Sequence, residues 1–435
     1  MKKYFGTDGI RGIPNINLTN EIISKISSSV EEVLKPTSVA VILDTRNSSL
    51  EILNWVCEGF SENIEVVNYG VLPSGSMPIL LKHFGHNLGI IISASHNPSE
   101  YNGIKLIDEN GSKLQDNVEI EIESYFEKIK VPKAHTSFKD SEDGYKVYYE
   151  FLNELFDFDI ANFNIVIDSA NGSAYKIIAH LLSENNSKFN MIANTPDGEN
   201  INFESGATYT NNLISTLKKG QIGAAFDGDA DRLIMVDEEG NTCNGDVLIL
   251  LIAKYLSATS QLNNNVVVST VMSNYGFKNA MEKNSFKNVE TSVGDKYVAE
   301  AMDENNASLG GEQSGHIIIS DKLPVGDGLL TLVYVLKALS FFNTTLAQFR
   351  IENIEEYPQK LVNLELEDKP NDKQLLELDL IAKKLSEESE LDGRYLIRNS
   401  GTEPMLRVLV EASNQELVEN FSNNLINNIK KFLQI

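Results

Sequence analysis

The sequence predicts an α/β protein with three similar α/β/α domains and a smaller C-terminal α+β domain. Short apolar runs alternate with segments of helical period over most of the chain, which is typical of layered α/β domains. Three loops with unusual polar residues each follow such an apolar run, at similar places in successive units. Because ligand sites of α/β folds gather at strand ends, we expect three related domains that face a shared cleft.

The expected elements follow from hydrophobic periodicity and from capping residues. In chain order they are a helix over 20–34 with Thr19 or Asn20 as N-cap, a strand over 39–43, a helix through Ile52, Leu53, Val56 and Phe60, and strands over 88–92, 165–167, 222–226 and 266–268. The first of the three loops follows 88–92, the second follows 222–226, and the third follows Ser308-Leu309-Gly310.

After Tyr357-Pro358 the pattern changes to that of a small α+β domain. Its expected elements are a strand near 361–366, a charged helix near 373–388, strands near 394–397 and 405–411, and a last helix near 415–433. We therefore expect four domains, at 1–145, 146–244, 245–356 and 357–435.

Composition excludes several classes of protein. The 435 residues carry 37 Lys and Arg against 62 Asp and Glu, and this formal charge of −25 repels phosphate backbones and anionic lipid. We therefore expect neither a nucleic-acid partner nor a membrane partner. With 42% hydrophobic and 23% charged residues, the chain is too apolar to be disordered.

The cysteines and the N-terminus indicate a cytoplasmic protein. Cys57 and Cys243 lie far apart, so the sequence holds no disulfide framework. The N-terminus runs into Phe5-Gly6-Thr7-Asp8-Gly9 without a hydrophobic signal core, and the apolar run at 247–253 is far short of the ~20 residues that span a bilayer.

Three aspartates after the strand over 222–226 predict a metal site. Asp227, Asp229 and Asp231 are separated by single small residues, and such oxygen ligands suit Mg²⁺ or Ca²⁺ rather than zinc. An acidic surface turn is disfavoured because core strands bracket the loop. An EF-hand would need Gly where Arg232 stands. A phosphatase with an aspartyl nucleophile would leave the third carboxylate unexplained.

The serine loop permits two interpretations. Ser95 lies beside His96, with Lys105 ten residues on, and lacks the Gly-x-Ser-x-Gly pattern of esterases. Such a serine could accept and donate a phosphoryl group. Alternatively, Ser93 and Ser95 only satisfy turn hydrogen bonds. The loop by itself leaves both interpretations open.

Two further loops predict ligand contacts. Arg398-Asn399-Ser400-Gly401-Thr402-Glu403-Pro404, followed by Arg407, resembles an anion cradle, because guanidinium and hydroxyl groups donate to phosphate and Gly401 lets backbone N–H groups approach it. An ordinary turn is the alternative. Glu312, Ser314 and His316 alternate, so an extended segment would point them to one side, where they could bind sugar hydroxyls. The neighbouring glycines leave a tight turn open instead.

Taken in order, these motifs resemble the α-D-phosphohexomutases, and most closely the bacterial branch that acts on glucosamine phosphates. The match covers essentially the whole chain. Its motifs are Gly6-Thr7-Asp8-Gly9-Ile10-Arg11-Gly12, the Ser95 loop, the Asp227 loop, Gly294-Asp295-Lys296-Tyr297, the Glu312 loop, Gly326-Asp327-Gly328 and the Arg398 loop. The sequence departs from the branch at Asn399, where proline is frequent, and at Gly206-Ala207-Thr208-Tyr209, which replaces the usual Gly-Ser-Thr-His.

The resemblance implies a fourth domain like the TATA-binding protein and a mechanism that uses a phosphorylated Ser95. Phosphoserine would give its phosphoryl group to one sugar oxygen, the hexosamine 1,6-bisphosphate would turn within the cleft, and the other phosphate would return to Ser95. The implied catalytic residues are Ser95, Arg11, His96, Lys105 and His316. The implied substrate-binding residues are Arg232, Lys296, Glu312, Ser314, Arg398, Ser400, Gly401, Thr402 and Arg407. One Mg²⁺ per chain would be held by phosphorylated Ser95, Asp227, Asp229 and Asp231. Either His316 or Lys105 would move the proton of the sugar hydroxyl.

The implied activity is interconversion of glucosamine 6-phosphate and glucosamine 1-phosphate, which supplies UDP-N-acetylglucosamine and peptidoglycan. A small sugar phosphate is the expected partner, hexosamine 1,6-bisphosphate the activator, and a homodimer the expected assembly. Gln313 favours glucosamine, because relatives that act on mannose or glucose phosphates more often carry methionine there. The alternatives are a phosphomannomutase/phosphoglucomutase and a catalytically silent sugar-phosphate-binding or calcium-binding protein, which would need no nucleophile.

Overall fold

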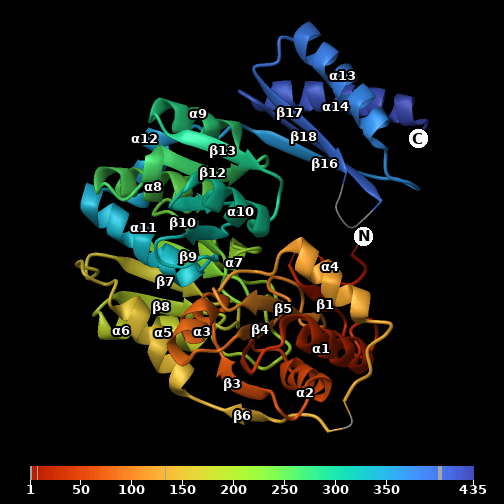
Figure 1. The fold of residues 1–435 in the computed structure, drawn as a ribbon. Helices are drawn as coiled ribbons and strands as arrows, with labels where there is room; N and C mark the ends of the chain where they lie inside the picture. The colour runs from red at the N-terminus through yellow and green to blue at the C-terminus, as the bar shows by residue number, and fades with distance from the viewer. Residues whose placement is uncertain (1, 7, 133, 400–403) are drawn as a thin grey trace. The chain divides into compact units, whose positions relative to one another are not determined.

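The computed structural model describes residues 2–6, 8–132, 134–399 and 404–435. The chain forms two compact units (Figure 1). The larger unit comprises Met1–Met272 and Ser285–Glu352, and the smaller unit comprises Ser273–Asn284 and Asn353–Ile435. The smaller unit is therefore built from two separate stretches of sequence.

The first sheet of the larger unit has six strands in the order β1-β5-β4-β2-β3-β6. Its strands are β1 (Ile10–Gly12), β2 (Ser38–Leu43), β3 (Glu65–Val71), β4 (Leu88–Ile92), β5 (Asn102–Asp108) and β6 (Phe138–Asp140). Its helices are α1 (Asn20–Leu34), α2 (Ser49–Gly59), α3 (Met77–Phe84), α4 (Asp116–Tyr125) and α5 (Asp143–Asn153), with a short 3₁₀ turn η1 (Ser74–Ser76). Strand β2 pairs in parallel with β3 and β4, whereas β5 is antiparallel to β4 and β1.

Alternate residues of β2 face two different cores, which makes three layers. Val39, Val41 and Leu43 pack in one apolar cluster with residues of α1 and α2. Ala40 and Ile42 pack in another with residues of α3. This alternation follows from the two-residue period of a strand, so β2 is buried on both faces.

The second sheet has five strands in the order β11-β10-β9-β7-β8. They are β7 (Asn164–Asp168), β8 (Lys188–Ile192), β9 (Ile222–Phe226), β10 (Leu233–Val236) and β11 (Thr242–Cys243), with helices α6 (Tyr175–Glu184) and α7 (Asn211–Thr216). Strand β7 is parallel to β8 and β9, and β10 turns back antiparallel to β9. The loop between β9 and β10 carries the three aspartates.

The third sheet has four strands in the order β13-β12-β14-β15. They are β12 (Val266–Thr270), β13 (Lys287–Thr291), β14 (Leu309–Gly311) and β15 (Ile317–Ile319), with helices α8 (Gly245–Ala258), α10 (Asp295–Asn305), α11 (Gly328–Phe342) and α12 (Leu346–Asn353) and a 3₁₀ turn η2 (Asn263–Asn265). Among the described residues, no single helix has the length and apolarity that crossing a membrane requires; α11 and α12 meet that test only together, bent by 79°.

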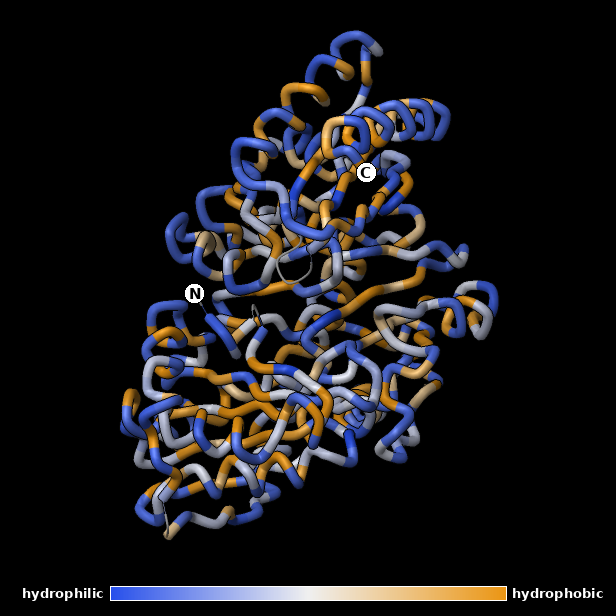
Figure 2. Tube along the Cα trace, turned by 90° about the vertical axis from the view of Figure 1, so that its right-hand side faces the viewer, coloured by the Kyte–Doolittle hydropathy of each residue, from blue (hydrophilic) through white to orange (hydrophobic). Residues whose placement is uncertain are grey.

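The smaller unit has a three-stranded antiparallel sheet in the order β16-β18-β17. Its elements are α9 (Tyr275–Lys283), β16 (Gln359–Glu365), α13 (Asp372–Glu388), β17 (Gly393–Asn399), β18 (Met405–Ala412) and α14 (Gln415–Leu433). One face of β18 packs against α13 and α14 through Leu406, Val408 and Val410. The helical coils near the C-terminus alternate hydrophobic and hydrophilic stretches, as amphipathic helices do (Figure 2).

The expected strands and helices are confirmed to within a few residues. Thr19 is the N-cap of α1, where its hydroxyl accepts a hydrogen bond from the Ile22 N–H. The C-terminal region has the predicted order of strand, helix, two strands and helix. The sequence did not predict that α9 belongs to the smaller unit.

Candidate active site

Ser95 lies in the loop between β4 and β5, with its side chain directed at the aspartate loop. Its hydroxyl donates a hydrogen bond to Asp227 Oδ2 at 2.7 Å, and it lies 3.3 Å from His96 Nδ1. The residue is 1% exposed and has a φ of +51°, a left-handed conformation that is unfavourable for serine. The geometry therefore goes beyond the simple turn that was one interpretation of this loop.

Burial makes His96 a neutral side chain. Desolvation, together with the nearby charges of Arg232 and Arg11, lowers the pKa of His96 to about 4. At neutral pH the imidazole is uncharged beside the Ser95 hydroxyl. Arg11 reaches the same loop by donating to Asn97 Oδ1 at 3.4 Å.

The three aspartates form a compact cluster of oxygen atoms. One carboxylate oxygen from each of Asp227, Asp229 and Asp231 lies within 4.8 Å of the others, and all three residues are buried. Burial and the charges of its two neighbours raise the pKa of Asp227 well above its ordinary value. Oδ1 of Asp229 and Oδ1 of Asp231 have no hydrogen-bond partner in the described part of the chain.

A hard divalent cation fits this cluster. Three buried carboxylates repel one another, and two of their oxygens are left without a donor, so a cation would satisfy both demands. Gly228 is required in the loop because a Cβ there would lie 2.6 Å from the Ser95 carbonyl oxygen. Strands rather than helices flank the cluster, which contradicts the EF-hand alternative.

Lys105 sits among the carboxylates of this site. Its ammonium lies 2.8 Å from Asp229 Oδ2, 3.1 Å from Asp231 Oδ2 and 3.2 Å from Asp8 Oδ2. Although desolvation opposes its charge, these neighbours raise the pKa of Lys105 well above its ordinary value. Lys105 is thus a permanently charged donor at the aspartate loop, and this makes it a poor general base in this arrangement.

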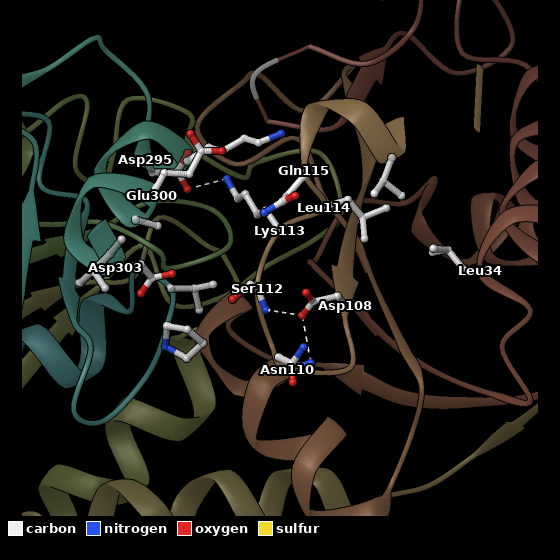
Figure 3. A pocket seen from close by; sticks show the side chains of 16 residues that line it. Leu34, Asp108, Asn110, Ser112, Lys113, Leu114, Gln115, Asp295, Glu300 and Asp303 are labelled. Carbon is white, nitrogen blue, oxygen red and sulfur yellow. Dashed lines mark hydrogen bonds and ion pairs between the residues drawn. The ribbon is translucent and has the colours of Figure 1, made fainter. Parts of the chain in front are cut away.

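A buried chain of charges extends from Lys105. Asp8 pairs with Arg11, Lys105 and Lys113, and Lys113 Nζ also lies 2.5 Å from Asp295 Oδ2. Figure 3 shows Lys113 and Asp295 pointing toward one another across the edge of a pocket of about 490 Å³. Asp295 in turn lies 3.2 Å from His316 Nε2.

Arg232 and His316 come together through their backbones. They form an isolated antiparallel bridge, and the Arg232 Nε lies 3.9 Å from carboxylate oxygens of Asp227 and Asp231. His316 Nδ1 has no hydrogen-bond partner among the described residues. The side chain of His316 packs directly on Gly326, where a Cβ would lie 2.4 Å from the ring.

Of the two interpretations left open for the Glu312, Ser314 and His316 segment, the structure shows the tight turn and not the extended segment. The segment connects β14 to β15 as a tight turn, in which the Gly315 N–H donates to the Glu312 carbonyl at 3.0 Å and Gly315 has a φ of +91°. Glu312 and His316 are buried, whereas Ser314 is exposed. Glu312 Oε1 accepts a hydrogen bond from the Gly294 N–H at 3.0 Å.

Lys296 contacts residues of α4 and, within the described part of the chain, none of the serine or aspartate loop. Its ammonium lies 2.5 Å from Asp116 Oδ1 and 3.5 Å from Glu119 Oε2, both on α4. No described contact joins it to Ser95 or to the aspartate cluster.

Arg398 and Arg407 are cross-strand neighbours on β17 and β18 of the smaller unit. Burial and the nearby positive charge of Arg407 lower the pKa of Arg398. Ser400, Gly401 and Thr402, which complete the predicted cradle, lie outside the described residues.

Sequence reasoning missed several residues that shape this site. Ser74 donates from its backbone N–H and from its hydroxyl to Asp229, at 2.9 and 2.8 Å. Asp8 and Asp295 stand inside motifs that the sequence singled out, but Lys113 carries no local signal. Arg46 and Asn202 contact the backbone of the Ser95 loop. Arg46 lies in a polar run after a buried strand, as the predicted loops do, but that placement does not indicate which groups its guanidinium contacts.

Models of one protein family match nearly the whole chain in order. The models described as phosphoglucomutase/phosphomannomutase α/β/α domains I, II and III match residues 2–133, 125–240 and 244–357. The model of the C-terminal domain matches residues 361–427. The predicted fold class, three α/β/α domains and a C-terminal α+β domain, is confirmed.

Curated relatives align with the chain over nearly its full length. The phosphoglucosamine mutase of Lactobacillus gasseri is 39% identical over 437 residues, which cover 97% of each chain. That of Shouchella clausii is 37% identical over 446 residues, which cover 100% of each.

Solved structures show the same fold at lower identity. A phosphoglucomutase/phosphomannomutase family protein from Burkholderia thailandensis has a TM-score of 0.81 at 20% identity, over 99% of this chain and 98% of that one. The N-acetylphosphoglucosamine mutase of Aspergillus fumigatus, solved in complex with GlcNAc-6P and magnesium, has a TM-score of 0.73 at 17% identity, over 99% of this chain and 96% of that one.

Proposed function

The chain belongs to the phosphoglucomutase/phosphomannomutase family, and from this premise we propose that it interconverts glucosamine 6-phosphate and glucosamine 1-phosphate through a phosphorylated serine. Its curated relatives are phosphoglucosamine mutases, which are isomerases that move a phosphate within one sugar. The product would supply UDP-N-acetylglucosamine and, through it, peptidoglycan.

One contact carries the proposal: the Ser95 hydroxyl lies 2.7 Å from Asp227 Oδ2. A nucleophile directly beside a cluster of three carboxylates suits phosphoryl transfer, because charge on the transferring group needs positive stabilisation. Lys105, Arg11 and Arg232 all lie at this cluster or at the serine loop. A silent binding protein would need none of this arrangement.

The proposed reaction conserves phosphate over two transfers. The Oγ–P bond of phosphorylated Ser95 breaks while a sugar hydroxyl oxygen forms the new P–O bond, and the hydroxyl proton passes to a base. The bisphosphorylated sugar then turns, its other phosphate returns to Ser95 Oγ, and the proton returns to the oxygen left behind. His316 is the better placed base, since its Nδ1 has no partner among the described residues and its Nε2 faces Asp295.

We propose one Mg²⁺ per chain, held by Asp227, Asp229, Asp231 and an oxygen of phosphorylated Ser95. The orphaned carboxylate oxygens of the cluster support it, as does the magnesium reported for the Aspergillus fumigatus mutase. When bound, the ion would neutralise charge on the transferring phosphoryl group. The chain's own residues would hold the serine, orient the carboxylates and move the proton.

Glucosamine is the proposed sugar because the curated relatives at 36–39% identity are phosphoglucosamine mutases. Arg398 and Arg407 are proposed as phosphate ligands, and Glu312 as a ligand of sugar hydroxyls. Phosphomannomutase/phosphoglucomutase activity is the second candidate, favoured by the names of the family models. A cytoplasmic homodimer that binds no nucleic acid or membrane completes the proposal.

A coupled assay tests the function. Purified protein with Mg²⁺ and a trace of hexose 1,6-bisphosphate is given glucosamine, glucose and mannose phosphates in parallel. We expect the fastest turnover with glucosamine phosphate, one phosphate on Ser95 by intact mass and peptide mapping, and no turnover by Ser95→Ala. Faster turnover of mannose or glucose phosphate would refute the substrate, and full activity of Ser95→Ala would refute the mechanism.

A further inference from the structure

We infer that Arg46 and Asn202 are positioning residues that hold the backbone of the Ser95 loop in the shape phosphoryl transfer needs. The inference rests on the proposed function and names residues that no motif of the site includes. Neither side chain is at hydrogen-bond distance from the Ser95 hydroxyl. Both bind backbone carbonyl groups of the loop; Arg46 precedes the loop in the sequence, and Asn202 follows it.

Arg46 gathers four carbonyl groups of one loop onto a single guanidinium. The residue lies between β2 and α2 and is 3% exposed. Its Nη2 donates to the carbonyls of Ser95 at 3.0 Å and Asn97 at 2.7 Å. Its Nη1 donates to those of Pro98 and Tyr101. Because one planar group binds all four, the path of the loop from 95 to 101 is fixed by Arg46.

Asp44 balances the charge of Arg46 and, through the Ser93 hydroxyl, also helps to hold the backbone N–H of Ser95. Its Oδ2 accepts from Arg46 Nε at 2.8 Å and from the Ser93 hydroxyl at 2.6 Å. The Ser93 Oγ accepts from the Ser95 N–H at 2.9 Å. The peptide groups on both sides of Ser95 are therefore held, one through Ser93 and one through Arg46.

Asn202 reaches the same carbonyls from the segment before α7. Its Nδ2 donates to the carbonyl of Ser95 at 2.8 Å and to that of Asn97 at 3.0 Å. Asn202 itself has a φ of +59°, a conformation that asparagine tolerates better than most residues. Its own N–H donates to the Ala170 carbonyl at 2.9 Å, so the donor is supported by the loop that follows β7.

These contacts account for the left-handed conformation of Ser95. A serine at φ near +50° costs about 1–2 kcal/mol relative to ordinary backbone, so it persists only where its surroundings determine it. Binding the carbonyls to Arg46 and Asn202 also directs their negative ends to these donors, and away from a dianionic phosphoryl group on Oγ. Loss of either residue should misplace Oγ rather than weaken sugar binding.

The test compares Asn202→Asp and Arg46→Lys with the wild type. Asn202→Asp keeps size and tolerance of positive φ but replaces both donated hydrogen bonds with repulsion of two carbonyls. Arg46→Lys keeps the charge beside Asp44 but cannot span four carbonyls. We expect kcat to fall about 10–100-fold with KM within about threefold, because small displacements of a reacting atom cost rates of this size. The fraction of phosphorylated Ser95 should fall in parallel. Asn54→Asp, on the exposed face of α2, is the matched control and should keep kcat.

Because Asn202 is only half-buried, its variant is expected to stay folded even if Arg46→Lys does not. A melting temperature well above the assay temperature establishes this for each variant. A folded Asn202→Asp with wild-type kcat and wild-type phosphorylation would overturn the inference. So would a loss seen in KM alone. Absence of mutase activity in the wild type would instead refute the proposed function, so the two failures are distinguishable.

Discussion

The role proposed for Asp227 as a metal ligand would come at a cost to stability. It lies within 4.8 Å of two further carboxylates, and burial with these neighbours raises its pKa well above its ordinary value. Asp227→Asn removes one repelling charge from the cluster but also one proposed metal ligand. In EDTA we expect the variant to melt at or above the wild-type temperature, as judged by differential scanning fluorimetry.

Addition of Mg²⁺ should reverse this order. The wild type should gain about 2.7 kcal/mol when free Mg²⁺ is a hundredfold above its Kd, whereas Asp227→Asn should gain much less. Asp303→Asn, which makes the same change on the exposed face of α10, should respond as the wild type does. An equal Mg²⁺ response in Asp227→Asn would mean that the ion binds elsewhere.

Asp327 is expected to make stability depend on pH. It caps α11 by accepting from the N–H groups of Leu329 and Leu330, and it accepts from the Tyr148 hydroxyl at 2.7 Å. Burial raises its pKa from 3.8 to about 6. A raised pKa means that the folded state holds the proton more tightly than the unfolded state. This contribution is full below about pH 3.8 and is lost as pH rises through 6.

Asp327→Asn removes that dependence while keeping a side chain that can cap the helix. Between pH 4 and pH 7 the wild type should lose on the order of 3 kcal/mol of unfolding free energy relative to the variant. Urea unfolding at several pH values measures it. A difference that stays constant with pH would contradict the prediction.

At the residue scale, the sequence predicted functional residues that lie close together in the chain, but it did not predict contacts between residues that are far apart in the chain. The aspartate loop was predictable because its three carboxylates lie within five consecutive residues after one strand. Arg46, Asn202 and Lys113 were not, because each meets its partner only after segments far apart in sequence fold together. Lys296 illustrates the same limit: its motif singled it out, but the partner on its ammonium is Asp116 on another sheet's helix.

Among the elements, the crossing of α1 and α2 depends on small residues. A Cβ at Gly59 would lie 2.2 Å from the Ser24 carbonyl and 2.5 Å from the Ser27 Cβ, and Ser28 donates to the Gly59 carbonyl at 2.6 Å. Gly59→Ala should therefore push the helices apart and cost about 1–3 kcal/mol of unfolding free energy. Asn54→Ala on the exposed face of α2 should change it by less than about 0.5 kcal/mol. Equal midpoints for the two variants in urea would refute the close approach.

In the smaller unit, Asn274 fastens α9 to the strands. Its Oδ1 accepts from the N–H groups of Gly276 and Tyr357, and its Nδ2 donates to the Tyr357 carbonyl and to Glu411. Asn274→Ala removes the helix cap and leaves its buried partners without a hydrogen bond, which should lower the free energy of unfolding by about 2–4 kcal/mol. Hydrogen exchange should become faster in α9 and near 357. Unchanged protection there would show that α9 is held by other contacts.

Elements were easier to predict than the turns between them. Hydrophobic periodicity, which is a local property of the sequence, predicts buried strands such as β2 and amphipathic helices such as α14. The turn after β14 could not be decided from the sequence, because the alternation of Glu312, Ser314 and His316 fits an extended strand and the neighbouring glycines fit a tight turn equally well. Only the pairing of β14 with β15 decides it, since a hairpin this short must reverse direction within the glycine-flanked segment.

For the whole molecule, the formal charge of −25 opposes compactness. Exposed acids such as Glu387, Glu388 and Glu390 face solvent and are screened by salt, whereas the ion pairs around Lys105 are buried and screened little. Raising NaCl from about 20 to about 300 mM shortens the Debye length from about 20 to about 6 Å. The melting temperature should therefore rise by about 1–4 °C. A fall with salt would mean that exposed ion pairs outweigh the net repulsion.

The two separate stretches of the smaller unit set an order of events during synthesis. Asn274 leaves the ribosome long before Tyr357 and Glu411, its partners, exist as protein. At about 5–20 residues per second the delay is on the order of 10 s. For that time α9 has no completed unit to join, and the strands that fold in between must leave it free. Helix α9 can therefore complete its contacts only after β18, the last strand to be synthesised, has supplied Glu411.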